Sequence, residues 1–206
     1  IKLIHRDKWF IQPFQKDNYL ATPYRDKITL IQQFFIPSNL FRTLEIKKCL
    51  QINADNPHLD HIYLLNERIY TQQELGLNDK QFSRVTQVEI GHRLTYGDVV
   101  KFVNTPLPNS DTPTLSGYIV FSNSDIYLDP DTLRNVYYTS LSKTRSWYAL
   151  LRTEAYYKVL FGPNSYAQDT WIFHTNPFRE NSLDPTPLNY YLGKFKEDLS
   201  YQNRYL

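Results

Sequence analysis

The segment Gly117–Leu133, GYIVFSNSDIYLDPDTL, decides most of what can be inferred about this chain of 206 residues. Its apolar part, 118–122, predicts a buried strand that leads directly into Asn-Ser-Asp at 123–125. A second carboxylate, Asp129, follows and precedes a helix start. A carboxylate directly after the carboxyl end of an apolar strand contributes little to packing. It is well placed to hold a divalent cation against a phosphorylated ligand.

Apolar strands and helices alternate on both sides of this turn. Short apolar runs predict six strands, at 28–36, 61–65, 85–90, 117–122, 147–152 and 171–174. Periodicity and capping signals predict helices at 41–53, 71–75, 95–103, 129–141 and 195–206. Such alternation with short connections predicts an α/β domain with a mostly parallel central sheet flanked by helices.

Composition excludes several classes of protein. The formal net charge of +2, without a clustered basic face, predicts no nucleic-acid partner. The single cysteine, Cys49, rules out an internal disulfide and is expected to be a small buried side chain. No membrane span is expected, and the cytoplasm (the host's, for a viral protein) is the default location. P-loop, nucleophile-elbow, dinucleotide-binding and zinc-protease motifs are absent from the sequence.

The polar residues that close the predicted strands are the first candidates for a binding site. In parallel α/β sheets, ligands bind beyond the carboxyl ends of the strands. Four short segments occupy that position, at 37–38, 66–67, 91–93 and 123–125.

Asn123 and Asp125 form the clearest candidate pair. Residues two apart in an extended chain point the same way, so both are expected to share one face. An amide oxygen and a carboxylate are ligands of the kind that Mg²⁺ and Mn²⁺ prefer. A turn-capping role for Asp125 fits the same spacing, and the pattern alone does not decide between the two.

Three stretches resemble the nucleotide-sugar glycosyltransferases with the GT-A fold, including those of large DNA viruses and bacteria. They are the strand and turn at 117–133, LTYGDVVKFVN at 94–104, and QDTWIF at 168–173. The resemblance implies a GT-A-like fold, in which a Rossmann-like sheet binds the nucleotide.

The resemblance also implies a division of the chain. It covers 28–206 and leaves 1–27 as an N-terminal arm or the end of a preceding segment. Within the GT-A-like domain, 28–125 is the implied nucleotide-binding half and 126–206 the acceptor-side half.

In that fold, a D-x-D-type motif after the fourth strand holds the metal that bridges the diphosphate. Asn123-Ser124-Asp125 stands at this place, with asparagine at the first position and hence one charge fewer. The resemblance implies that Asp125 and Asn123 hold Mn²⁺ or Mg²⁺ and that Ser124 lies beside the nucleotide.

Further residues receive implied roles at the nucleotide. Phe35 and Pro37 would form the floor of the pocket for the base. Glu67 would face the nucleoside, and Arg93 would reach a phosphate or the base. Ordinary positions in a core strand or a solvated loop are equally compatible with these four residues.

On the acceptor side, the resemblance implies that Asp169 binds sugar hydroxyls or takes the proton of the attacking hydroxyl. It places Arg152, Trp171 and Asp198 on the same side. His174 after the sixth strand is a possible metal ligand, although lone histidines are usually not ligands.

The sequence therefore predicts a divalent-metal-assisted glycosyltransferase. It would move a sugar from a nucleoside-diphosphate donor, with UDP as one option, to a hydroxyl of a glycan or protein. The alternative is a non-catalytic nucleotide- or glycan-binding module of a larger protein, which the asparagine in the metal motif keeps open.

Overall fold

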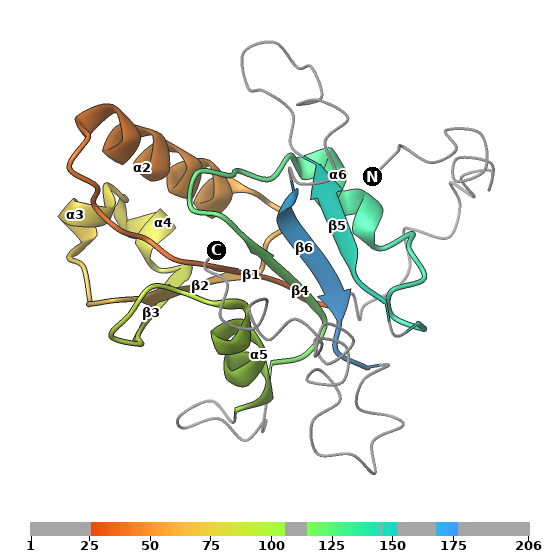
Figure 1. Ribbon diagram of the computed structural model, residues 1–206. Coiled ribbons are helices and arrows are strands. Elements are labelled where there is room, and N and C mark those ends of the chain that lie inside the picture. The colour runs from red at the N-terminus through yellow and green to blue at the C-terminus, as the bar shows by residue number, and fades with distance from the viewer. Residues whose placement is uncertain (1–25, 106–114, 145, 152–167, 177–206) are drawn as a thin grey trace.

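The computed structural model describes residues 26–105, 115–144, 146–151 and 168–176 (Figure 1). They form one six-stranded sheet in the order β3-β2-β1-β4-β6-β5. The strands are β1 (Ile28–Gln32), β2 (His61–Asn66), β3 (Val85–Glu89), β4 (Tyr118–Ser122), β5 (Tyr148–Leu151) and β6 (Gln168–His174). β1 pairs in parallel with β2 and β4, and β2 pairs in parallel with β3. Only the pairings of β6, with β4 and β5, are antiparallel. The predicted mostly parallel α/β sheet is confirmed.

Five helices accompany the sheet in the described residues. They are α2 (Leu40–Asp55), α3 (Gln72–Leu75), α4 (Asp79–Phe82), α5 (Tyr96–Asn104) and α6 (Pro130–Val136). The predicted capping box is present at α5, where Thr95 and Asp98 bond reciprocally, and Asp129 caps α6 as expected. α6 ends at Val136, before the expected 141, and the short helix α4 was not predicted. The expected helix at 195–206 lies outside the described residues.

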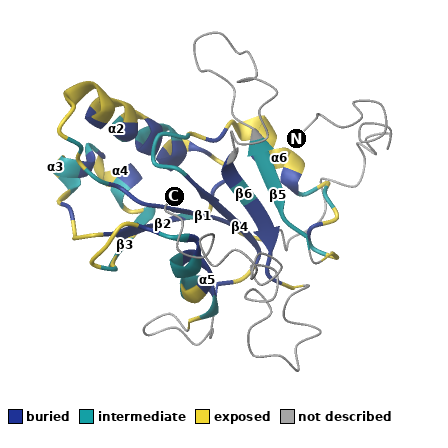
Figure 2. Ribbon diagram, viewed as in Figure 1, coloured by how far each residue is buried: buried dark blue, intermediate teal, exposed yellow. Residues whose placement is uncertain are grey.

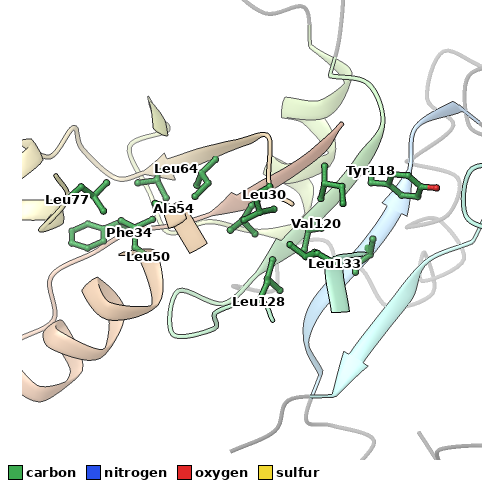
Figure 3. Close-up of a cluster of buried hydrophobic side chains, with 14 of the residues drawn as sticks. Leu30, Phe34, Leu50, Ala54, Leu64, Leu77, Tyr118, Val120, Leu128 and Leu133 are labelled. Atoms are coloured by element: carbon green, nitrogen blue, oxygen red, sulfur yellow. The ribbon is translucent and has the colours of Figure 1, made fainter. Parts of the chain in front are cut away.

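The core has two layers because side chains alternate across the sheet. On β4, Tyr118 and Val120 face one hydrophobic cluster, and Ile119 and Phe121 face the other. The first cluster is covered by α2, α3 and α6, and Figure 3 shows its side chains following one another along this face of the sheet. The second cluster is covered by α5. The central strands β1 and β4 are buried throughout (Figure 2), which explains their continuous apolar sequences.

The chain reverses its direction of travel across the sheet between β1 and β4. From β1 it crosses through α2 to β2 on one side, and after β3 it returns through α5 to β4 on the other side of β1. α2 and α5 therefore lie on opposite faces of the sheet (Figure 1). This reversal is the topological switch point at which open α/β sheets bind their ligands.

β6 runs opposite to β4, and this places its two ends at different edges. Thr170 at its start pairs with Ser122 at the end of β4, and His174 at its end pairs with Tyr118. His174 is fully buried, 3.1 Å from Asp26. It therefore lies at the edge of the sheet opposite the carboxyl end of β4, which leads into 123–125. A metal role for His174 beside Asp125 is wrong for this reason.

At the same edge as His174, Gly117 allows the backbones of two strands to meet. Its φ is +97°, and a Cβ placed there would lie 2.4 Å from the carbonyl oxygen of Lys27. That carbonyl accepts the hydrogen bond from the backbone amide of Tyr118 that begins the pairing of β4 with β1. Only glycine fits this backbone conformation and this space.

Gly117→Ala is therefore expected to lower the free energy of unfolding by about 3 kcal/mol, because steric overlap adds to an unfavourable φ. Urea denaturation of this variant and of the unmodified chain measures the loss. Gly91→Ala is the matched control, since Gly91 also has a positive φ (+74°) but open space around its Cβ position. It is expected to cost about 1 kcal/mol. Equal losses in the two variants would contradict the packing argument.

Candidate functional site

The carboxyl ends of β1, β2, β3 and β4 share one edge of the sheet because these strands are parallel. The start of β6 joins the same edge because β6 is antiparallel to β4. The candidate site is built around the switch point at this edge, from the ends of β1 and β4 and the first turn of α2.

Within the described part of the chain, no helix is long and apolar enough to cross a bilayer.

Asn123 and Asp169 meet directly at this edge. The Asn123 side-chain amide donates a hydrogen bond of 2.8 Å to Oδ1 of Asp169, and its backbone amide donates one of 3.1 Å to the Asp169 carbonyl. Asp169 is 8% exposed and belongs to β6, which begins three residues earlier than expected, at Gln168. The structure thus brings together two predicted site residues that are 46 positions apart. The amide holds a buried carboxylate in a fixed orientation.

Asp125 has a different partner. Its Oδ2 accepts a hydrogen bond of 2.7 Å from the Arg42 guanidinium in the first turn of α2. The expectation that Asn123 and Asp125 share one face is wrong. β4 ends at Ser122, and 123–126 form a turn closed by the hydrogen bond from Ile126 N to Asn123 O. The extended geometry that would align the two side chains is absent from this turn.

A buried network of amides fixes the backbone of this turn. Gln32, at the end of β1, donates from its side chain to Ser122 Oγ (2.8 Å) and to the carbonyls of Asn123 (2.9 Å) and Ile126 (3.0 Å). Asn53 on α2 donates to the Ile126 carbonyl (3.0 Å) and accepts from Leu128 N (2.8 Å). The backbone beyond β4 is therefore held by side chains from both β1 and α2.

Asn53 and Asn56 extend this network along α2. Asn56 donates to the Leu128 carbonyl at 2.8 Å, and both side chains are buried. The sequence carries a signal for Asn53, which lies on the face of α2 that also carries Ile46 and Leu50. A polar residue on an apolar helical face indicates a buried hydrogen-bonding role. Gln32 gives the same kind of signal inside the apolar run of β1.

Asn53→Ala is expected to lower the free energy of unfolding by about 3 kcal/mol, because it removes the acceptor of the buried Leu128 amide and one of the two side-chain donors to the Ile126 carbonyl. It should also expose the Leu128 amide to faster hydrogen exchange. Urea denaturation and amide exchange by NMR measure the two effects. Asn135→Ala, at an exposed position on α6, is the control. A loss as small as that of the control would contradict the positioning role of Asn53.

Cys49 lies beneath the same turn. Its thiol donates to the Asp125 carbonyl at 3.1 Å, and it is 6% exposed. Burial, followed by the nearby Asp125 and Glu45 carboxylates, raises the pKa of Cys49 to about 12. The thiolate is therefore scarce at neutral pH, and Cys49 is the small buried side chain that the sequence predicted.

The end of β1 contacts the loop after β3. The Arg93 guanidinium lies over the Phe35 ring, 5.7 Å from its centroid. Gln33 holds this loop in place, because its side chain donates to the His92 carbonyl (3.0 Å) and accepts from Leu94 N (3.2 Å). The structure thus brings together Phe35 and Arg93, two residues expected at a nucleotide. Gln33 was missed, although it interrupts an apolar run.

Glu67 directly follows β2, as expected, whereas β1 ends at Gln32 instead of the expected 36, so Pro37 lies five positions beyond its strand. Pro37 is half-buried, and its carbonyl accepts a hydrogen bond of 3.2 Å from the Thr43 hydroxyl. Glu67 is exposed, directly after Asn66. Asn66 is fully buried and joins β2 to the chain after β1, because its Oδ1 accepts from Phe34 N at 2.8 Å.

Three residues expected on the acceptor side, and Ser124 expected beside the nucleotide, remain. Trp171 is half-buried and stacks on Phe121, with ring centroids 5.3 Å apart, while Tyr96 meets it edge-on at 4.9 Å. This aromatic packing belongs to the α5 side of the sheet. Arg152 and Asp198 lie outside the described residues. Ser124 occupies the turn with Asp125 and is half-buried.

A divalent cation fits Asp125 only in part. No group of three or more His, Cys, Asp or Glu side chains in the described ranges is arranged to hold a metal ion. Mg²⁺ in nucleotide sites uses one or two carboxylates and completes its shell with water and phosphate oxygens. Asp125 suits such a one-carboxylate site, whereas the Asn123 side chain is engaged with Asp169. The Arg42 guanidinium already holds one carboxylate oxygen of Asp125.

Comparison with known proteins finds similarity of structure alone. No family model and no curated protein matches the chain. One similar solved structure is a 4-diphosphocytidyl-2C-methyl-D-erythritol synthase, 15% identical with a TM-score of 0.45, over 82% of this chain and 86% of that one. Another, from Anaerococcus prevotii DSM 20548, is described by the same name. It is 13% identical with a TM-score of 0.38, over 88% of this chain and 90% of that one. Likeness at this level says nothing of activity, so the site is interpreted from its own geometry.

Proposed function

We propose that this chain is a glycosyltransferase that takes a sugar from a nucleoside-diphosphate donor at the carboxyl edge between β1 and β4. One observation carries the proposal: the buried Asp169 carboxylate is held by Asn123 at the switch point of the sheet. A buried carboxylate held in one orientation at the ligand-binding edge of an α/β sheet has the chemistry that a general base requires.

The nucleotide would lie over the end of β1. Phe35 offers an aromatic face, Arg93 offers a guanidinium group over that ring, and Arg42 offers a second one beside Asp125. Guanidinium groups bind phosphate oxygens through paired N–H donors. Pro37, Glu67 and Ser124 would complete the contacts to the nucleoside and diphosphate.

The chemical step requires a base and a way to stabilise the leaving diphosphate. Asp169 accepts the proton of the acceptor hydroxyl, whose oxygen forms the new bond to the anomeric carbon. The bond from that carbon to the diphosphate oxygen breaks, and the nucleoside diphosphate leaves with the electron pair. Asn123 keeps the Asp169 carboxylate in its orientation. Bound Mn²⁺ or Mg²⁺ at Asp125 would withdraw charge from the diphosphate.

Calorimetry with a panel of nucleoside diphosphates, with and without Mn²⁺, tests the proposal. We expect one nucleotide to bind more tightly in the presence of Mn²⁺, together with slow hydrolysis of the matching nucleotide sugar. Metal-indifferent binding without hydrolysis would instead support a non-catalytic module. The pairing of Asp125 with Arg42 is the observation that favours this second candidate. Absence of any nucleotide binding would contradict the glycosyltransferase and would leave the glycan-binding form of the module.

A further inference from the structure

The first two turns of α2 carry an apolar patch on their outer side. Leu40, Phe41 and Leu44 form this α2 patch, because residues three and four apart on a helix are neighbours. Their exposed fractions are 68%, 82% and 55%, and Ile36, which precedes the helix, is 43% exposed. Single exposed apolar side chains are ordinary, whereas several large ones gathered on one surface indicate a binding partner.

Packing of α2 on the sheet uses another side of the helix. Ile46, Leu50 and Ala54 are buried there and belong to the first hydrophobic cluster. The outer side of a surface helix is ordinarily polar. Figure 2 shows instead that the start of α2 is exposed where its sequence is most apolar. The core of the domain therefore does not account for the α2 patch.

Positive charge follows the patch on the next turn of the helix. Lys47 and Lys48 lie three and four positions after Leu44, and Lys48 is exposed. Glu45 is the carboxylate within the same turns, and its charge is compensated because Arg42 pairs with it at 2.6 Å. An exposed apolar surface with lysines at its border is the result.

This composition favours a lipid bilayer over a protein as the partner. Protein interfaces are depleted in lysine, and a stable one uses about 20–30 residues on each side. The α2 patch is much smaller than that. Helices that lie in the plane of a bilayer place Phe and Leu among the acyl chains, while the adjoining lysines extend to the headgroups. Anionic headgroups attract such lysines.

We propose that the α2 patch docks on an anionic membrane surface. Leu40, Phe41 and Leu44 enter the acyl region, and Lys47 and Lys48 contact the headgroups. The helix lies on the bilayer and does not cross it. This inference rests on α2 alone and is independent of the proposed function.

Docking in this way has a consequence for the candidate site. Arg42, which pairs with Asp125 at the carboxyl edge of the sheet, belongs to the same two turns of α2 as the patch. A chain bound through the α2 patch would therefore hold the candidate site close to the membrane surface.

Co-sedimentation of the full chain with lipid vesicles, without nucleotide or metal, tests the inference. We expect binding to an equal mixture of phosphatidylcholine and phosphatidylserine, and about 10-fold weaker binding to phosphatidylcholine alone. Phe41→Ser should weaken binding to the mixed vesicles about 10-fold, because its ring no longer leaves water. Lys48→Gln should weaken it about 5-fold and leave binding to phosphatidylcholine unchanged.

Three further variants make the result specific. Tyr138→Ser removes an exposed ring just after α6, which lies away from the start of α2 (Figure 1). Lys101→Gln removes an exposed lysine of α5, on the opposite face of the sheet. Both should bind within about 2-fold of the unmodified chain. Phe41→Trp should bind at least as tightly as the unmodified chain, because tryptophan favours the membrane interface.

Phe41→Ser should keep the urea midpoint of the unmodified chain, because Phe41 is exposed. Loss of vesicle binding at full stability would support the docking role. Three results would overturn the inference: no binding of the unmodified chain to the mixed vesicles, equal binding by Phe41→Ser and Tyr138→Ser, or a dimer in analytical ultracentrifugation that Phe41→Ser dissociates. The last result would assign the α2 patch to a second copy of the chain. None of these measurements involves a nucleotide, so their failure is distinguishable from failure of the proposed function.

Discussion

Asp169→Asn is expected to slow hydrolysis or transfer of the donor sugar by about 100-fold or more, because loss of a general base typically costs that much. The amide keeps the size of the side chain and retains an oxygen that accepts from Asn123. Donor affinity should therefore change little, and the loss should fall on the rate of turnover. Steady-state kinetics with the nucleotide sugar identified by calorimetry measures both quantities.

Thr170→Ser is the control for disturbance of β6, since Thr170 is buried in the same strand next to Asp169. Its turnover should stay within about 3-fold of the unmodified chain. Turnover of Asp169→Asn at the level of this control would contradict the assignment of Asp169 as the base.

Asp125→Ala is expected to abolish the Mn²⁺-dependent part of turnover, a fall of about 100-fold or more, because charge on the leaving diphosphate is no longer neutralised there. The substitution also frees Arg42 from its partner. Metal-independent binding of the nucleotide should consequently persist. Turnover measured over a series of Mn²⁺ concentrations separates the metal-dependent part from the rest.

Asp129→Asn is the matched control for Asp125→Ala. Asp129 lies four positions further along, and its carboxylate accepts from Thr132 N at 2.9 Å as the N-cap of α6. Asparagine caps helices equally well, so neither stability nor turnover should change appreciably. Full Mn²⁺-dependent turnover in Asp125→Ala would refute a metal role for this carboxylate.

The elements that the sequence predicted correctly are those specified by local signals. β1 and β4 are continuous apolar runs, because helices cover both faces of the sheet at these strands. α5 begins where Thr95 and Asp98 form a capping box within four residues. Such features depend on neighbours in the chain and need no knowledge of the tertiary structure.

The errors came from interactions between distant segments. Arg42 and Asp125 are 83 positions apart, so nothing near either residue indicates their ion pair. The direction of β6 relative to β4 could not be inferred from the sequence either. Because β6 is antiparallel to β4, Asp169 lies at the candidate site and His174 at the opposite edge. β6 also begins early, because pairing of Thr170 with Ser122 extends the strand through polar residues.

The side chains that support the site were missed for a related reason. Gln32 and Asn53 are polar residues in apolar surroundings, and their sequence positions indicate only that a buried partner exists. Which backbone groups they bond depends on how α2 packs beside the turn after β4. The roles of Phe35, Pro37, Glu67, Arg93 and Ser124 toward a nucleotide stay predictions.

A crystal structure of the chain soaked with UDP and MnCl₂ tests the central claim most directly. The account predicts density for the diphosphate beyond the carboxyl ends of β1 and β4, beside Asp125, with the base over Phe35 and Asp169 facing the end of the diphosphate. Clear nucleotide density at another surface, with Asp125 still paired to Arg42, would contradict it.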